Sequence, residues 1–307
     1  MASSLLLGVE KAGHKVVGAL RWQSNNENHI KSGIQDFLFP DKFYTLIKAS
    51  KAVDIKAKSA NSKEFLRQAL RLEPDVILVG SWGEKIKKPT IMLPKIAAIN
   101  CHPSLLPEHR GANPYASSIR AGAEKTGVTF HLIDENIDTG AILLQKELKI
   151  NDYDTGGDVK IKCAYIAENA VKELLDGIEV GAIKPKDQYE PHSSYFPQLT
   201  EDDAIIDWMK PANEIHNQIR GLNPWIKCYF SHKGNFLFIG KSKVIKLENP
   251  ENNFGKILKK GKNSILISTG DPNSAVLVEK LRLYGFLEGF LTNNYIISKI
   301  KIGDCVV

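Results

Sequence analysis

Short apolar runs that alternate with helix-like segments constrain the fold of this chain most strongly. Residues 76–79 (Val-Ile-Leu-Val) form one such run, and a second one, in the strand expected at residues 95–99, ends at Ile99. Strands that are apolar on both faces are typical of a parallel sheet covered by helices. The helices are expected at residues 3–12, 64–72 and 154–175. We therefore predict an α/β fold with a doubly wound, mainly parallel sheet for residues 1–184.

The pattern changes towards the C-terminus. Residues 185–204 contain Pro185, Pro191 and Pro197 and are predicted to form a linker. Residues 205–307 contain short apolar runs separated by turns rich in Gly, Asn, Asp and Lys. That spacing is typical of a small antiparallel barrel. We predict two domains, 1–184 and 205–307, joined by this linker.

Basic charge is concentrated in the second of these domains. In residues 208–307, thirteen Lys and two Arg outnumber seven acidic residues by eight, whereas the whole chain has a net charge of +6. A basic domain attached to a nearly neutral one suggests a polyanionic partner. A Lys-rich surface that only aids solubility explains the charge equally well.

The remaining composition limits the class of protein. Four cysteines lie far apart with no paired spacing, which predicts neither a disulfide framework nor a zinc site. Cys101 is expected to be a buried thiol. No apolar stretch approaches the roughly 20 residues that span a bilayer. We expect a cytoplasmic monomer with no membrane partner.

Three polar side chains follow or separate the predicted strands. Asn100 and His102 come directly after the apolar run, and alternate residues of an extended segment face the same side. Asp138 lies in a turn between two further expected strands. An amide can donate to an oxyanion, an imidazole can move a proton, and a carboxylate can orient the imidazole. These groups suit acyl transfer to an amine, although a turn cap for Asn100 and a solvated acidic turn for Asp138 are simpler alternatives.

The same residues stand within motifs that resemble the formyltransferase family dependent on 10-formyltetrahydrofolate. The motifs are Asn-x-His-Pro-Ser-Leu-Leu-Pro at 100–107, Arg-Gly-Ala-Asn-Pro at 110–114, Thr-Gly-Val-Thr at 126–129 and Asp-Thr-Gly-Ala-Ile-Leu-Leu-Gln at 138–145. The resemblance implies that Asn100, His102 and Asp138 are catalytic, that 10-formyltetrahydrofolate is the co-substrate, and that no metal is required. It also implies an OB-like barrel for the C-terminal domain.

Further residues are assigned to the folate by the same resemblance. The loop against the folate consists of Ser104, Leu105, Leu106 and Pro107. Trp82 and Gly83 follow the strand at 76–79 and are expected to form the pterin pocket, although Trp82 could equally be a core residue. His131, on the strand before the Asp138 turn, is expected to line the site.

Three functions remain open for the acceptor. The whole chain resembles the family members that formylate the methionine on initiator tRNA, and the basic C-terminal domain favours that reading. A sugar-nucleotide N-formyltransferase with the same folate donor is the alternative. A non-catalytic RNA-binding protein is the third reading, which an intact Asn100, His102 and Asp138 disfavours.

The sequence departs from the family pattern in two places. Family members have a strand before the helix at 3–12, whereas this sequence starts at that helix. Either the true start codon lies upstream of the recorded one, or this is a truncated form. In a truncated form we expect two neighbouring strands without a partner and an opening in the core. The loop that is usually basic in tRNA-formylating members corresponds to residues 21–40, which carry only two firm positive charges, Arg21 and Lys31.

Overall fold

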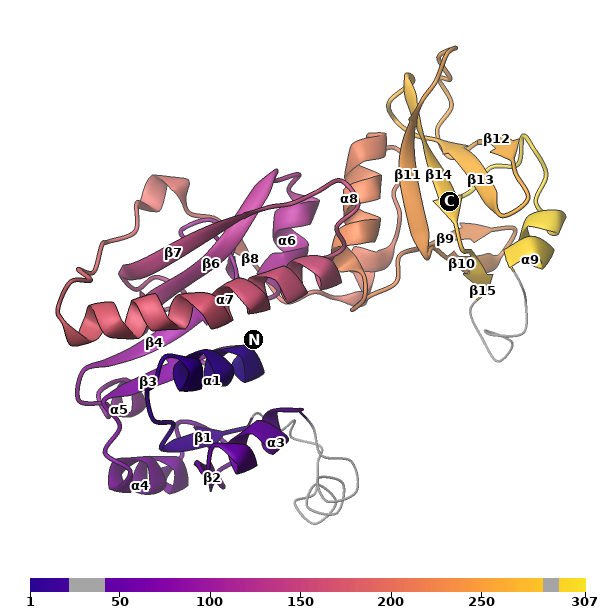
Figure 1. Ribbon diagram of the computed structural model, residues 1–307. Helices are drawn as coiled ribbons and strands as arrows, with labels where there is room; N and C mark the ends of the chain where they lie inside the picture. Colours follow the sequence, from indigo (N-terminus) through magenta and orange to yellow (C-terminus); the bar gives the residue numbers. More distant parts are fainter. Residues whose placement is uncertain (22–41, 284–292) are drawn as a thin grey trace. The chain divides into compact units, whose positions relative to one another are not determined.

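The computed structural model describes residues 1–21, 42–283 and 293–307 (Figure 1). These residues form two compact units. Unit 1 comprises residues 1–114, 126–148 and 160–196, and unit 2 comprises residues 115–125, 149–159 and 197–307. Two short segments, residues 115–125 and 149–159, therefore belong to unit 2 although they are separated from its main part in sequence. The continuous domains expected at 1–184 and 205–307 stay predictions.

Helices and short strands alternate up to residue 196, as the apolar runs predict. In chain order they are α1 (Ala2–Lys11), β1 (Gly18–Leu20), α3 (Lys42–Ala49), β2 (Val53–Ile55), α4 (Lys63–Arg71), β3 (Val76–Val79), α5 (Lys88–Ile91), β4 (Ala97–His102), β5 (Arg110–Gly111), α6 (Pro114–Arg120), β6 (Lys125–Leu132), β7 (Ile142–Lys149), α7 (Gly156–Glu179), the 3-10 helix η1 (Glu190–His192) and β8 (Tyr195–Phe196). The start of α4 follows from Ser62, whose hydroxyl accepts a hydrogen bond from the Phe65 N–H.

The sheet that carries the polar motif has the strand order β3-β4-β6-β7 (Figure 1). β3 and β4 are parallel, with Val79 opposite Asn100. β4 and β6 are antiparallel, with His102 opposite Thr129. The predicted α/β class is confirmed, but β4 continues to His102 instead of ending at Ile99. Asn100 and His102 are therefore paired residues of strand β4 and do not lie in a loop after the strand.

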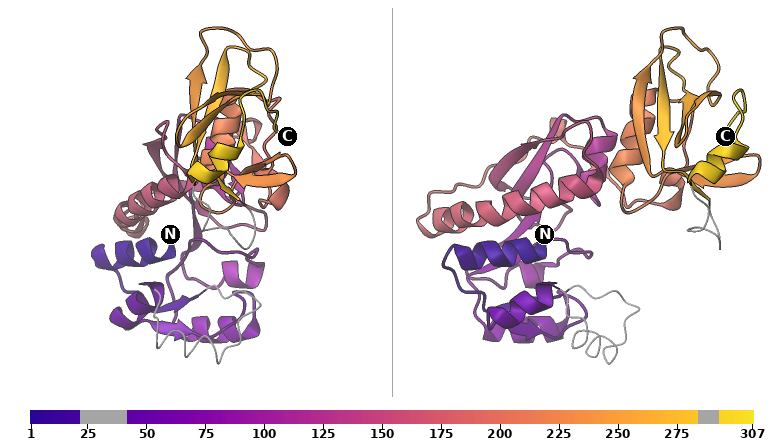
Figure 2. Two further views of the ribbon diagram at one scale, coloured as in Figure 1. Left: turned by 90° about the vertical axis from the view of Figure 1, so that its right-hand side faces the viewer. Right: turned by 45° about the vertical axis from the view of Figure 1, so that its right-hand side comes forward.

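Helices α1 and α7 lie side by side against this sheet (Figures 1 and 2). Their backbones approach closely at Gly8, where a Cβ atom would lie 2.5 Å from the Glu168 carbonyl oxygen. Lys11 and Glu168 also form an ion pair between the two helices. Within the part of the chain that the structure describes, no helix is long and apolar enough to cross a bilayer.

The sheet of unit 1 is interrupted next to α1. β1 pairs in parallel with β2 in a separate two-stranded sheet, and among the described strands neither pairs with β3. An apolar cavity lies there and is lined by side chains of α1, β1 and β3. β1 and β3 thus belong to different sheets, and the expectation about a strand before residues 3–12 stays a prediction.

Unit 2 contains the antiparallel strands expected after residue 205. Its elements are the 3-10 helix η2 (Glu201–Ala204), α8 (Ala212–Leu222), β9 (Tyr229–His232), β10 (Asn235–Phe238), β11 (Lys241–Lys246), β12 (Ile257–Lys260), β13 (Ser264–Ser268), β14 (Ser274–Glu279), β15 (Arg282–Leu283) and α9 (Asn293–Lys299). The strands form two sheets, ordered β11-β14-β13-β12 and β15-β10-β9. Their inner faces and α8 share one apolar core that includes Trp208, Ile215 and Phe230.

The C-terminal tail joins the two sheets of unit 2. Val307 exchanges both backbone hydrogen bonds with Ser231 of β9, and the Val306 N–H donates to the Gly255 carbonyl beside β12. Cys305 forms an antiparallel bridge with Lys256. The tail thus supplies pairing between the edges of β9 and β12, while the OB-like barrel stays a prediction.

We expect the substitution Val306→Ala to destabilise unit 2, because this side chain is 6% exposed and belongs to the apolar core. The free energy of unfolding should fall by about 1–3 kcal/mol. Val307→Ala is the matched control, since that side chain is 83% exposed and should change stability by less than about 0.5 kcal/mol. Urea unfolding measures both. Equal losses in the two variants would contradict the role of the tail.

Candidate active site

The turn that carries Asp138 is fixed by close backbone packing. Gly140 sits so near the end of β6 that a Cβ atom would lie 1.8 Å from the Leu132 carbonyl oxygen, so only glycine fits. The Thr139 hydroxyl donates to the Asp134 carboxylate across the turn. Asp138 itself has a φ of 56°, a conformation that non-glycine residues adopt at a cost. The turn therefore holds the Asp138 carboxylate in one direction.

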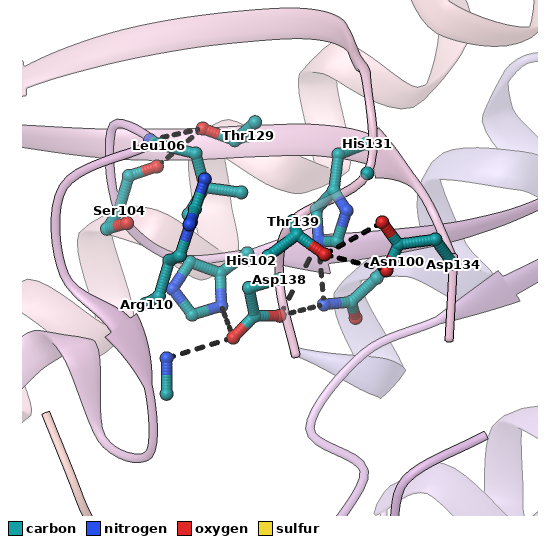
Figure 3. A network of polar contacts seen from close by, with 12 residues as sticks. Asn100, His102, Ser104, Leu106, Arg110, Thr129, His131, Asp134, Asp138 and Thr139 are labelled. Atoms are coloured by element: carbon teal, nitrogen blue, oxygen red, sulfur yellow. Dashed lines mark hydrogen bonds and ion pairs between the residues drawn. The ribbon is translucent and has the colours of Figure 1, made fainter. Parts of the chain in front are cut away.

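The three residues expected to be catalytic meet around this carboxylate (Figure 3). Asp138 Oδ1 accepts a hydrogen bond from the Asn100 amide at 3.2 Å. Asp138 Oδ2 lies 3.5 Å from His102 Nδ1 and accepts a hydrogen bond from the Gly111 N–H at 3.0 Å. The predicted Asn100, His102 and Asp138 thus come together in space, although 36 residues separate the last two in sequence.

His102 is buried, and only one of its ring nitrogens is available for proton exchange. Nε2 lies 2.9 Å from the His109 carbonyl oxygen, which can only accept, so Nε2 carries a proton. Nδ1 faces Asp138. Burial lowers the pKa of His102, although the charge of Asp138 and the His109 carbonyl oppose that shift. The neutral ring can take up a proton at Nδ1, where the Asp138 carboxylate would stabilise the imidazolium.

The Asn100 amide is already engaged with the protein. Its Nδ2 lies 3.1 Å from His131 Nε2 and 3.2 Å from Asp138 Oδ1, so two acceptors match its two protons. His131 can accept there because its Nδ1 donates to the Leu132 carbonyl at 2.8 Å. An oxyanion that binds to Asn100 must therefore replace one of these partners. His131, expected to line the site, lies directly against the amide.

The pKa of the Asp138 carboxyl is far from its ordinary value. Burial opposes ionisation, but contacts with His131 and His102 and the Gly111 N–H lower the pKa to about 2. Asp138 is therefore a carboxylate over the whole physiological pH range. It can act as a fixed negative charge beside His102 and does not compete with it for a proton.

Hydrogen bonds from Thr129 and Gln145 fix the backbone of the predicted folate loop. Thr129 donates to the Ser104 carbonyl and accepts from the Leu106 N–H, and Gln145 donates to the Leu106 carbonyl. Ser104 and Leu106 are buried, whereas Leu105 and Pro107 are half-buried. Only the latter two side chains are placed to present surface to a ligand. Ser104 and Leu106 hold the loop.

Trp82 and Gly83 lie where β3 ends, at the same sheet edge as Asn100. The Trp82 indole donates to Glu84 at 3.3 Å and packs against the apolar cluster of Ile55 and Phe65. Trp82 is therefore partly a core residue, as its alternative assignment expected, while Gly83 is exposed. Their role towards folate stays a prediction.

A second layer of contacts around the Asp138 turn was not expected from the sequence. The Gln188 amide donates to the carbonyls of Asp138 and Gly140. Arg110 in turn donates to the Gln188 side chain and forms a bidentate pair with Glu190. Gln188 and Glu190 belong to the stretch expected to be a linker, in which β8 pairs with β5, the strand of Arg110. No local signal marks Gln188, because its partners are about 50 residues away.

Three further expectations concern the basic loop, a metal site and Cys101. Residues 22–40 of the loop that is usually basic lie outside the described residues. Among residues 1–21, 42–283 and 293–307, no group of three or more His, Cys, Asp or Glu is placed to hold a metal ion. Cys101, which separates Asn100 from His102, is 2% exposed, and the expected buried thiol is confirmed.

Two family models match the chain. Residues 24–175 match the model described as formyl transferase, and residues 198–285 match the model of the formyl transferase C-terminal domain. The methionyl-tRNA formyltransferase of Clostridioides difficile is 36% identical over 224 residues, which cover 73% of this chain and 72% of that protein. The enzyme of the same name from Caldanaerobacter subterraneus is 35% identical over 69% of this chain and 68% of that protein.

Solved structures share the fold at lower identity. An N-formyltransferase from Helicobacter canadensis, in complex with folinic acid and dTDP-3-aminofucose, has a TM-score of 0.60 and 22% identity over 78% of this chain and 82% of that chain. The sugar 3N-formyl transferase WlaRD has a TM-score of 0.67 and 19% identity over 90% of this chain and 93% of that chain. These similarities concern the fold alone.

We expect the free energy of unfolding to depend on pH in the acid range because of the Asp138 carboxylate. Its folded pKa of about 2 is below the ordinary 3.8, so the carboxylate adds about 2 kcal/mol to stability above pH 4. That contribution is lost as the pH falls from 4 to 2. Urea unfolding should therefore show wild type more stable than Asp138→Asn at pH 6, with the difference closing in acid.

Asp134→Asn is the control for this prediction, because Asp134 lies in the same turn and contacts neither His102 nor His131. It should follow the wild-type pH dependence. A constant stability difference between wild type and Asp138→Asn from pH 6 to pH 2.5 would contradict the assigned shift.

Proposed function

Because this chain belongs to the formyl transferase family, we propose that it transfers the formyl group of 10-formyltetrahydrofolate to the amino group of methionyl initiator tRNA. The observation that carries this proposal is similarity to methionyl-tRNA formyltransferases at 36% identity over 73% of the chain. A match to the C-terminal domain model supports the same acceptor, since it covers the basic part of the sequence.

The proposed reaction uses Asn100, His102 and Asp138 as catalytic residues. The neutral amine attacks the formyl carbon, a C–N bond forms, and the carbonyl electron pair moves to the oxygen. The Asn100 amide donates to that oxyanion. His102 Nδ1 accepts the proton that the amine loses, and Asp138 stabilises the resulting imidazolium. The bond from the carbon to N10 then breaks, and His102 returns a proton to N10.

The folate would be held by the loop and the strand end described above. Half-buried Leu105 and Pro107 offer apolar surface, and the backbone around Ser104 and Leu106 is fixed by Thr129 and Gln145. Gly83 is exposed and Trp82 half-buried at the neighbouring strand end. These residues fit a flat, partly apolar ring with polar edges.

The acceptor assignment is tested by transfer of labelled formyl groups to charged initiator tRNA. We expect turnover on methionyl initiator tRNA and at least about 100-fold less on a dTDP-linked amino sugar. Turnover confined to the amino sugar would replace the proposal by the sugar-nucleotide alternative. Binding of tRNA without turnover on either acceptor would support the non-catalytic RNA-binding reading and refute the enzymatic one.

Alanine variants test the residue roles. Asn100→Ala and His102→Ala should each lower kcat by at least about 100-fold, because each removes a group that acts only in the transition state. Binding of the folate donor, measured by calorimetry, should persist in both. Asn136→Ala and His192→Ala are matched controls, since both side chains are exposed and neither is a hydrogen-bond partner of Asn100, His102 or Asp138 in the part of the chain that the structure describes. A wild-type kcat in either Asn100→Ala or His102→Ala would remove that residue from the mechanism.

A further inference from the structure

Aromatic side chains gather on the outer face of the three-stranded sheet β15-β10-β9 in unit 2. Tyr229 of β9 lies opposite Phe238 of β10, and Phe236 is two residues before Phe238 on the same face. The intervening Phe230 and Leu237 are 1% and 3% exposed and face the core. Tyr229, Phe236 and Phe238 therefore form a group on the outer face, called the aromatic platform here.

The rings of this platform are in contact with one another. The Tyr229 ring centroid lies 5.4 Å from that of Phe236 and 5.5 Å from that of Phe238. Phe236 is nevertheless 51% exposed. Such contacts stabilise a hairpin, but they do not account for a large apolar ring left in water. Tyr229 and Phe238 are half-buried beside Phe236, so the three rings together form one partly exposed apolar group, and contiguous apolar surface of this kind can mark a binding site.

Basic side chains adjoin the platform. Arg282 of β15 is opposite Phe238 and therefore shares its face. Lys280 lies two residues before Arg282. Lys241 begins β11 of the other sheet, where it is opposite Glu279, the residue before Lys280. All three are exposed, and none forms an ion pair with any residue that the structure describes. Lys241, Lys280 and Arg282 are called the basic edge.

We propose that the aromatic platform and its basic edge bind unpaired nucleotides of the tRNA substrate. This inference rests on the proposed function, which brings an RNA to the protein. Aromatic rings stack on bases, and adjoining Lys and Arg contact the phosphates. Only unpaired nucleotides can stack in this way, because the bases of a stem are stacked on each other. The positive charge of the basic edge favours RNA over an apolar protein surface.

The substitution Phe236→Ala tests the platform in the full-length protein. It should weaken binding of labelled initiator tRNA roughly tenfold, by loss of base stacking, and raise KM for the tRNA equally while kcat changes less than about twofold. Phe236→Trp should restore binding. Phe254→Ala is the matched control, since Phe254 is also 51% exposed but lies outside the platform; it should bind as wild type does.

Inorganic polyphosphate separates stacking from charge, because it carries negative charge without bases. Its affinity should stay unchanged in Phe236→Ala and fall in Arg282→Gln. Wild-type tRNA affinity in Phe236→Ala, or an equal loss in Phe254→Ala, would overturn the proposal. So would a dimer that dissociates on Phe236→Ala without loss of tRNA binding, which would make the platform a contact between copies. If wild type binds tRNA but does not formylate it, the proposed function fails while the platform is still tested by binding.

Discussion

The site depends on the contacts that surround the buried carboxylate of Asp138. The carboxylate accepts hydrogen bonds from the Asn100 amide and the Gly111 N–H and faces His102 Nδ1. A buried charge is tolerated only when such partners surround it. Since these partners come from β4 and β5, the charge also fixes how those segments lie against the turn after β6. The Gln188 amide supports the same turn from outside.

Much of this arrangement follows from local patterns. The apolar run to Ile99 predicts a buried strand, and alternation along that strand places Asn100 and His102 on one side. The position of β4's end was not predictable, because residues 100–102 pair with β6 through contacts made about 30 residues later in the sequence. Pairing in the sheet, and not the apolar pattern, decides where this strand stops.

Other features had no local signal. Gln188 and Glu190 stand in a proline-containing stretch that reads as a linker, yet the structure pairs β8 with β5 and ties Arg110 to both residues. Short elements such as α5 and β8 have too few residues to show a period. His131 was expected near the site from its strand, but its hydrogen bond to Asn100 depends on a ring orientation set by the Leu132 carbonyl.

The hydrogen bonds of Asn100 decide how an oxyanion could bind there. One amide proton points at the Asp138 carboxylate and the other at the Nε2 atom of the His131 ring, and hydrogen bonds to charged acceptors are about twice as strong. Exchange of the His131 contact for an oxyanion therefore costs less than exchange of the Asp138 contact. An oxyanion would also be a stronger hydrogen-bond acceptor than His131 Nε2. A neutral formyl oxygen would be an acceptor of about the same strength as His131 Nε2. If the proposed role of Asn100 holds, its amide would therefore stabilise a charged transition state more than a neutral ground state, which is the difference that catalysis requires.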